Sequence, residues 1–272
     1  MYKPMYDGPK EKHTMPKNLI FIRHGESQAN EKYEKIKDLR HATDDDVTYP
    51  DREWGLTQKG INQAKRLGRF LNKDFNINFT NFYVSPYLRA RQTAAYLNLY
   101  NAKWQPRREL RERSWGDIDS IPTAEFKKNY PKNYSLHEQD PMYWTPPGGE
   151  SLASVAEGRL LSFFSDLKFE LPNNANVLCV CHHDIMLCAK IILEHLTDDS
   201  FIKAYNANKL NLPNASALCF SRRDPNNDSL NDSICFVRVI YFEDDGTLIS
   251  TPWSEINKPK YSNEQLLESE LL

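Results

Sequence analysis

The sequence predicts an α/β protein in which strands and helices alternate along the chain. Short apolar runs, typical of buried strands, end abruptly at polar residues, and stretches with the 3.6-residue period of a helix follow them. This alternation is repeated three or four times, which favours a layered sheet covered by helices. Ligands of such sheets bind beyond the carboxyl ends of the strands, so we expect the functional residues there.

The first part of the chain predicts one strand, one insertion and one helix. A polar leader, residues 1–17, is expected to be flexible, and the apolar run 19–22 then predicts a buried strand. Residues 31–55 are charged without a clear period and indicate an insertion over one end of the sheet. A helix is predicted from Thr57, a candidate N-cap, because five residues share one apolar face: Ile61, Ala64, Leu67, Gly68 and Leu71.

The middle of the chain repeats the pattern and then becomes irregular. The run 79–84 predicts the second strand, and Ser85-Pro86 opens a helix that continues to Leu97. Residues 113–148 are rich in proline, aromatic and charged residues, which indicates a second, irregular insertion. Ser151 is the candidate N-cap of the next helix.

The last part supplies the most clearly buried strand. Residues 177–181 are apolar, stop at His182-His183-Asp184 and precede a helix over 185–193. The runs 217–220 and 234–242 predict two further strands. We therefore expect a single domain over residues 18–250, followed by a C-terminal tail, residues 251–272.

Composition excludes several classes of partner. The 272 residues carry 35 Lys and Arg against 37 Asp and Glu, and this balance argues against nucleic-acid binding. No apolar run approaches the roughly 18 residues of a membrane helix, so we expect no membrane partner. The N-terminus lacks the apolar stretch of a secretory signal, and the five cysteines are an odd number. Reduced thiols and a cytoplasmic location are expected, while the oligomeric state stays open.

The residues after the predicted strands offer the groups that phosphoryl transfer needs. Arg23 and Arg89 present planar forks that bind phosphate oxygens and stay charged. Fixed positive charge beside His24 favours the neutral imidazole, which is a competent nucleophile toward phosphorus. Glu112 can protonate a leaving alcohol and then activate water, if burial raises its pKa. No metal ion is required for such a site.

Six short motifs follow one another in order along residues 18–240. They are Arg23-His24-Gly25-Glu26-Ser27 with Asn30, Leu56-Thr57-x-x-Gly60-x-x-Gln63-Ala64, Ser85 to Ala94, Leu110-Arg111-Glu112-Arg113 with Trp115-Gly116, Gly149-Glu150-Ser151, and Val180-Cys181-His182. A lone Arg-His-Gly is a weak signal, whereas the ordered set is specific. The set resembles the histidine phosphatase superfamily, the phosphoglycerate mutase-like proteins.

The resemblance implies a role for each matching residue. His24 would be the nucleophile and Glu112 the proton donor. Arg23, Arg89 and His182 would form the phosphate pocket, with Asn30 as a further contact. It also implies a three-layer α/β/α sandwich with a mostly parallel central sheet, and no metal or organic cofactor.

Departures from the family pattern favour hydrolysis. His183 stands where many relatives have glycine, and we expect it to contact the substrate. The insertion 31–55 is longer and more acidic than the link in the mutases, and the Gly-Trp stretch of cofactor-dependent mutases is missing. We expect a phosphomonoester hydrolase that acts on a small phosphorylated metabolite through a phosphohistidine. The alternatives are phosphoglycerate mutase-type transfer and a non-catalytic module that binds a phosphorylated ligand.

Simpler interpretations of the same residues stay open. Arg89 can be a surface arginine of its helix, and Glu112 can be a solvated member of a charged run. Only one of His182 and His183 should face the phosphate, since neighbours in a strand point to opposite sides, and we expect His182. Cys179 and Cys181 would share one strand face with His182 on the other, a poor geometry for a metal, so we expect none.

Overall fold

The computed structural model describes residues 13–36, 50–119, 121, 123–258 and 260–267, and one mixed sheet forms its centre. The strand order is β3-β2-β4-β1-β5-β6-β7, and β8 pairs with β6. The strands are β1 (Asn18–Arg23), β2 (Asn81–Val84), β3 (Trp104–Pro106), β4 (Asn176–Cys181), β5 (Ala217–Ser221), β6 (Phe236–Phe242), β7 (Leu248–Ser250) and β8 (Ser254–Glu255).

Strands β1 to β4 form the parallel half of the sheet. Strand β4 lies between β1 and β2 and is parallel to both, and β3 extends this half at its edge. The register places Arg23 opposite Cys181 in one pair and Val84 opposite Val180 in the next. The segments that follow these strands therefore leave the sheet at one place, as the sequence pattern predicts.

The other half of the sheet is antiparallel. Strand β5 runs antiparallel to β1, and β6 and β7 continue the antiparallel order. The predicted runs 217–220 and 234–242 are thus strands, although the second one begins only at Phe236. Strands β3, β7 and β8 are too short to give a sequence pattern and were not predicted.

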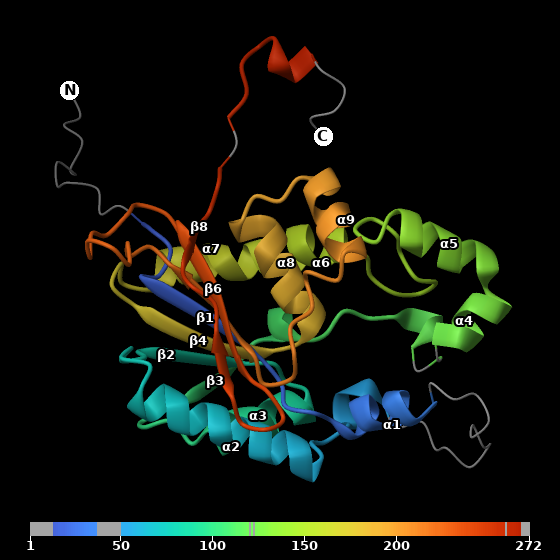
Figure 1. Ribbon diagram of the computed structural model, residues 1–272, viewed down its shortest axis with the longest axis horizontal. Helices are drawn as coiled ribbons and strands as arrows, with labels where there is room; N and C mark the ends of the chain where they lie inside the picture. The colour runs from blue at the N-terminus through green and yellow to red at the C-terminus, as the bar shows by residue number, and fades with distance from the viewer. Residues whose placement is uncertain (1–12, 37–49, 120, 122, 259, 268–272) are drawn as a thin grey trace, which may run out of the picture.

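Helices cover both faces of the sheet, which confirms the three-layer α/β architecture (Figure 1). On one face lie α2 (Gln58–Lys73) and α3 (Leu88–Leu97), and on the other lie α6 (Leu152–Val155), α7 (Leu161–Glu170) and α8 (His183–Leu193). Successive side chains of β1 point to opposite faces of the sheet, so this strand contributes to the core on both faces. Ile20 and Ile22 pack in the core under α2 and α3, whereas Leu19 and Phe21 pack in the core under α7 and α8.

Local signals place the ends of the helices. Thr57 accepts a hydrogen bond from the backbone N–H of Gly60 through its hydroxyl, and Ser151 caps α6 in the same way, so both predicted N-caps are confirmed. Helix α2 approaches α3 closely because Gly68 has no side chain. A Cβ at Gly68 would lie 2.0 Å from the backbone oxygen of Leu97.

The two insertions contain more regular structure than the sequence pattern predicts. Helix α1 (Gln28–Ile36) and the 3-10 turn η2 (Asp51–Glu53) fall within or beside the first insertion, and its residues 37–49 lie outside the described residues. The second insertion holds η4 (Gly116–Ile118), α4 (Thr123–Asn129) and α5 (Pro131–Gln139) to one side of the sheet (Figure 1). Helix α9 (Asp198–Asn206), outside both insertions, was not predicted either.

The chain ends make contacts that the sequence did not predict. Of the expected flexible leader, residues 1–12 lie outside the described residues, while Thr14 is buried and its hydroxyl donates to Asn173 at 2.8 Å. Of the expected tail, β8 pairs with β6 and Ile256 is buried. Among the residues that the structure describes, no helix combines the length and the apolar character needed to cross a bilayer.

Candidate functional site

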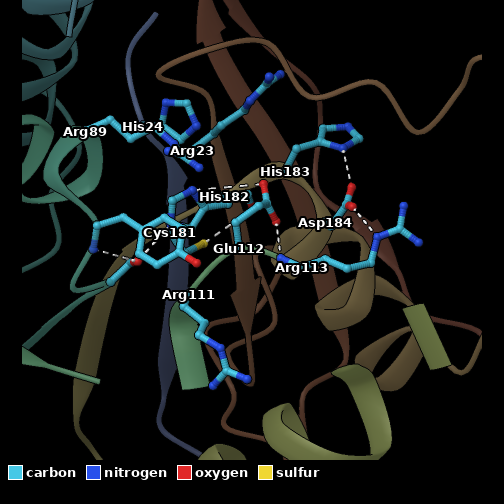
Figure 2. Close-up of polar contacts among 12 residues, drawn as sticks. Arg23, His24, Arg89, Arg111, Glu112, Arg113, Cys181, His182, His183 and Asp184 are labelled. Carbon is cyan, nitrogen blue, oxygen red and sulfur yellow. Dashed lines mark hydrogen bonds and ion pairs between the residues drawn. The ribbon is translucent and has the colours of Figure 1, made fainter. Parts of the chain in front are cut away.

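The predicted site residues gather at the carboxyl ends of the parallel strands. Strand β1 ends with Arg23 and continues into His24, β4 leads into His182, and Glu112 follows the 3-10 turn η3 (Arg108–Leu110). Figure 2 shows these four side chains close together, although they come from three separate segments of the chain. The ring centroids of His24 and His182 are 5.2 Å apart.

The His24 imidazole is buried and has one defined tautomer. Its Nδ1 lies 2.7 Å from the backbone oxygen of Gly25. Because a carbonyl oxygen only accepts, Nδ1 carries the proton and Nε2 keeps its lone pair. Burial, with the positive charges of Arg89 and Arg23, holds the pKa of His24 well below its ordinary value. The ring is thus neutral and free to act as a nucleophile through Nε2.

Backbone contacts fix the loop that carries His24. The N–H of Gly25 donates to the hydroxyl of Thr93 at 3.0 Å. The backbone oxygen of His24 accepts from the N–H of Ala215 and from the side-chain amide of Asn214, both at 3.1 Å. The loop is therefore held from α3 on one side and from the segment before β5 on the other.

The two predicted arginines differ in their bonding. Arg23 donates through Nη1 to the backbone oxygen of Leu212 at 2.5 Å, and its buried Nε has no hydrogen-bond partner among the described residues. The side chain of Arg89 is 5% exposed, which excludes a solvated surface arginine. Its Nη1 and Nη2 donate to the carboxylate of Asp51 at 3.0 and 3.1 Å. Asp51 was not predicted as a site residue.

His182 is the N-cap of α8, and its side chain is completely buried. Its Nε2 lies 2.8 Å from the hydroxyl of Ser85. Its Nδ1 is buried, has no hydrogen-bond partner among the described residues and lies 4.0 Å from a carboxyl oxygen of Glu112. Burial and the charge of Arg89 keep the pKa of His182 well below its ordinary value, so this ring is also neutral.

Glu112 brings a carboxyl group to the site. One of its oxygens accepts from the backbone N–H of Arg113 at 2.9 Å. Burial, and secondly the negative charge of Asp184, raise the pKa of Glu112 to about 8. The group therefore holds its proton at neutral pH, which a solvated member of a charged run would not do.

Arg159 organises the segment that carries Glu112. It belongs to the π-helical turn η5 (Ala156–Leu160) and donates to the backbone oxygens of Arg111 at 2.9 Å and Glu112 at 3.4 Å. It also donates to Glu150 at 2.9 Å, and Glu150 accepts from the backbone N–H of Ser114 at 3.0 Å. Glu150 of the Gly-Glu-Ser motif thus helps to hold the backbone on either side of Glu112.

His183 lies on the first turn of α8, beside the site but not within its buried centre. Its side chain is 27% exposed, and Nδ1 lies 3.2 Å from a carboxylate oxygen of Asp184. Asp184 accepts from Nε of the buried Arg113 at 2.7 Å. Burial opposes ionisation of Asp184, but the charges of Arg113 and His183 lower its pKa below the ordinary value. The different orientations of His182 and His183 follow from a helix start rather than from strand alternation.

The side-chain amides of Asn30 and Asn214 are hydrogen-bonded to each other, and Asn214 also contacts the loop that carries His24. The Asn30 side-chain oxygen accepts from the backbone N–H and hydroxyl of Ser27 at 3.1 and 3.0 Å. The Asn214 amide donates to the same oxygen at 3.2 Å. The Asn30 oxygen is thus used within the protein, and contact of Asn30 with phosphate stays a prediction.

Several residues that support the site were not predicted as site residues. Ser85, Thr93, Asn214 and Asp51 all contact a predicted site residue. Ser85 and Thr93 are completely buried, and their place within the motif Ser85 to Ala94 was the sequence signal that could have found them. Nothing in the local sequence marks Asp51 or Asn214.

The described residues contain no group of three or more His, Cys, Asp or Glu placed to hold a metal ion. Cys179 and Cys181 are completely buried in the apolar core. Burial raises the pKa of both thiols well above the ordinary value, so they stay protonated. They therefore serve as small core residues.

The sequence matches the family profile described as histidine phosphatase superfamily (branch 1) over residues 19–233. Human 6-phosphofructo-2-kinase/fructose-2,6-bisphosphatase 4 is 30% identical over 176 residues, which are 65% of this chain and 32% of that protein. The Xenopus tropicalis protein fructose-2,6-bisphosphatase TIGAR is 36% identical over 154 residues, 55% of this chain and 49% of that one. The chain thus spans about a third to a half of the length of these relatives.

Solved structures share the fold at lower identity. The α-ribazole phosphatase from Shigella flexneri superposes with a TM-score of 0.58 at 22% identity and covers 79% of this chain and 96% of its own. A mycobacterial glucosyl-3-phosphoglycerate phosphatase superposes with a TM-score of 0.59 at 22% identity and covers 75% and 92%. At these identities the likeness shows the fold alone.

Proposed function

Because the chain belongs to the histidine phosphatase superfamily, we propose that it hydrolyses phosphate monoesters through a phosphohistidine at His24. The observation that carries this proposal is the pair of protonation states in the site. The nucleophile is a neutral imidazole with its lone pair on Nε2, and the acid 4.0 Å from the neighbouring histidine keeps its proton at neutral pH. Phosphoryl transfer to nitrogen needs both states at once.

In the first step, His24 Nε2 attacks phosphorus as the bond from phosphorus to the ester oxygen breaks. Glu112 transfers its proton to that oxygen, so the alcohol leaves neutral and the carboxylate is formed. Arg23 and Arg89, whose charges act on His24, would balance the charge on the phosphoryl oxygens. His182 would donate from Nδ1, because its Nε2 can accept from the Ser85 hydroxyl.

In the second step, the Glu112 carboxylate takes a proton from water, whose oxygen attacks phosphorus. The bond from phosphorus to His24 Nε2 breaks, inorganic phosphate leaves, and the neutral imidazole and the protonated acid are restored. The same carboxyl group thus serves as acid and then as base. No metal ion or organic cofactor takes part in this scheme.

The proposed substrate is a small phosphorylated metabolite. The relatives are named for phosphatases of fructose 2,6-bisphosphate and of glucosyl-3-phosphoglycerate, which are small phosphate esters. His183 is 27% exposed and lies beside the buried centre, and this position supports our proposal that it contacts the part of the substrate outside the phosphate pocket. The cysteines of this chain are free, and we propose a reducing, cytoplasmic location.

The test is hydrolysis of p-nitrophenyl phosphate in excess EDTA by the wild type and by His24→Ala. We expect metal-independent turnover in the wild type and a loss of several orders of magnitude in the variant. His13→Ala removes an exposed histidine outside the site and serves as the matched control. Equal turnover in His24→Ala and wild type would contradict the proposal. Absence of turnover with transfer of label between phosphoglycerates would indicate a mutase instead.

A further inference from the structure

The terminal nitrogens of Arg89 already hold an acidic side chain. Nη1 and Nη2 donate to Oδ1 and Oδ2 of Asp51 at 3.0 and 3.1 Å, and Nη1 also donates to the Asp51 backbone oxygen at 2.6 Å. The Arg89 side chain is 5% exposed, whereas 30% of the Asp51 side chain is exposed. The buried guanidinium group of Arg89 is therefore held in a bidentate contact by Asp51, which is partly exposed to solvent.

A carboxylate and a phosphate use the same part of a guanidinium group. Both present two oxygens that accept parallel hydrogen bonds from the planar fork. A phosphate can therefore take Nη1 and Nη2 of Arg89 together only after Asp51 has moved away. The negative charge of Asp51 opposes an incoming phosphate in addition, because like charges repel at this range.

The turn that carries Asp51 can move at low cost. The 3-10 turn η2 consists of Asp51–Glu53, and none of its residues is buried. The chain becomes firmly attached only after it, where Gly55 exchanges two hydrogen bonds with Gln28 and the N–H of Leu56 donates to Gln92 at 2.7 Å. Release of Asp51 would thus expose no apolar core and leave this attachment in place.

We propose that Asp51 is a built-in competitor for the phosphate pocket, whose carboxylate holds Arg89 until a phosphate group displaces it. The inference rests on the proposed function in one respect, namely that the displacing anion is the phosphate of the substrate. Part of the binding free energy of every phosphate ligand is then spent on breaking the Asp51–Arg89 contact, and the observed affinity is correspondingly lower.

Calorimetric titration with inorganic phosphate tests this in the wild type, in Asp51→Asn and in Glu53→Gln. Asp51→Asn should bind phosphate about three- to tenfold more tightly, since it keeps the size of the side chain and removes its charge. Glu53→Gln should bind like the wild type, because Glu53 is 52% exposed and pairs with Arg52 in the same turn. Equal or weaker binding by Asp51→Asn would overturn the inference and make Asp51 a residue that merely holds Arg89 in place.

Hydrogen exchange in the wild type gives a second test that needs no variant. The N–H of Glu53 donates to the backbone oxygen of Pro50 at 2.8 Å and reports on the turn. Saturating phosphate should speed exchange in a peptide that covers residues 50–54 at least several-fold. Unchanged or slower exchange would show that Asp51 stays on Arg89 and would overturn the inference.

The binding measurements separate this inference from the proposed function. Tighter phosphate binding by Asp51→Asn without any turnover would overturn the proposed hydrolase activity and support the proposal that Asp51 competes with phosphate for Arg89. If Asp51→Asn turns over p-nitrophenyl phosphate normally, with no gain in affinity for phosphate and no fall in KM, hydrolysis is supported and the proposed competition by Asp51 is overturned.

Discussion

Replacement of Glu112 by glutamine is expected to make the protein less active and, at neutral pH, more stable. Burial and the nearby Asp184 raise the pKa of Glu112 from 4.5 to about 8. Between these two pH values the folded protein holds a proton on Glu112 that the unfolded chain has lost. The free energy of unfolding falls with rising pH wherever the folded state binds more protons, so the wild type loses stability across this window.

The magnitude follows from the size of the pKa shift. One pKa unit corresponds to about 1.4 kcal/mol. The raised pKa of Glu112 therefore lowers the free energy of unfolding by about 3 kcal/mol between pH 4.5 and pH 7. Glutamine has the same size and does not titrate, so this cost is absent in Glu112→Gln. The free energy of unfolding of the variant, minus that of the wild type, should rise by about 3 kcal/mol from pH 5 to pH 7.5. His24 and His182 titrate in both proteins, and their contributions cancel in the difference.

Urea unfolding followed by circular dichroism at several pH values measures this difference. Turnover of Glu112→Gln should fall by roughly 10²–10⁴, the usual range for loss of a general acid and base. Glu109→Gln is the matched control. Burial opposes ionisation of Glu109, but its hydrogen bond to Arg107 lowers its pKa, so this variant should lose stability mainly at neutral pH and less in acid. A stability difference for Glu112→Gln that does not change with pH would refute a buried, protonated Glu112.

The wild-type kcat/KM for p-nitrophenyl phosphate should decline as pH rises through about 8, because Glu112 loses its proton there. It should stay unchanged down to pH 6, because His24 remains neutral in that range. A decline of kcat/KM between pH 7 and pH 6 would contradict this prediction. Gly68→Ala should lower the free energy of unfolding by about 1–3 kcal/mol through overpacking, whereas Gly158→Ala, which meets no atom within 4 Å, should be neutral or slightly stabilising in the same urea titration. Ser85→Ala should cost about 1–3 kcal/mol of stability and lower kcat, because a buried ring nitrogen loses its partner; unchanged kcat and stability would speak against that contact.

The sequence predicted three of the four parallel strands, β1, β2 and β4, because their signals are local. The run of apolar residues in β1 is buried on both sides, and the caps at Thr57 and Ser151 form with residues three positions away. The positions of His24 and His182 followed from the same logic, since each comes directly after a buried strand. Parallel registers then bring such residues together without further information.

Features that depend on packing between distant segments were not predictable. Asp51 contacts Arg89 across 38 residues, and Ser85 contacts His182 across 97. Nothing near Asp51 in the sequence indicates that its carboxylate meets a buried guanidinium. The antiparallel direction of β5 and β6 was equally hidden, because an apolar run carries no information on the direction of its neighbour.

The short edge strands described above have a consequence for self-association. Strand β3 has three residues and ends in Pro106, which has no N–H to offer to another chain, and β7 at the opposite edge also has three residues. An intruding strand would find too few free backbone groups at either edge for stable pairing. This sheet is therefore protected against growth into intermolecular fibrils, even though its central strands are among the most apolar segments of the chain.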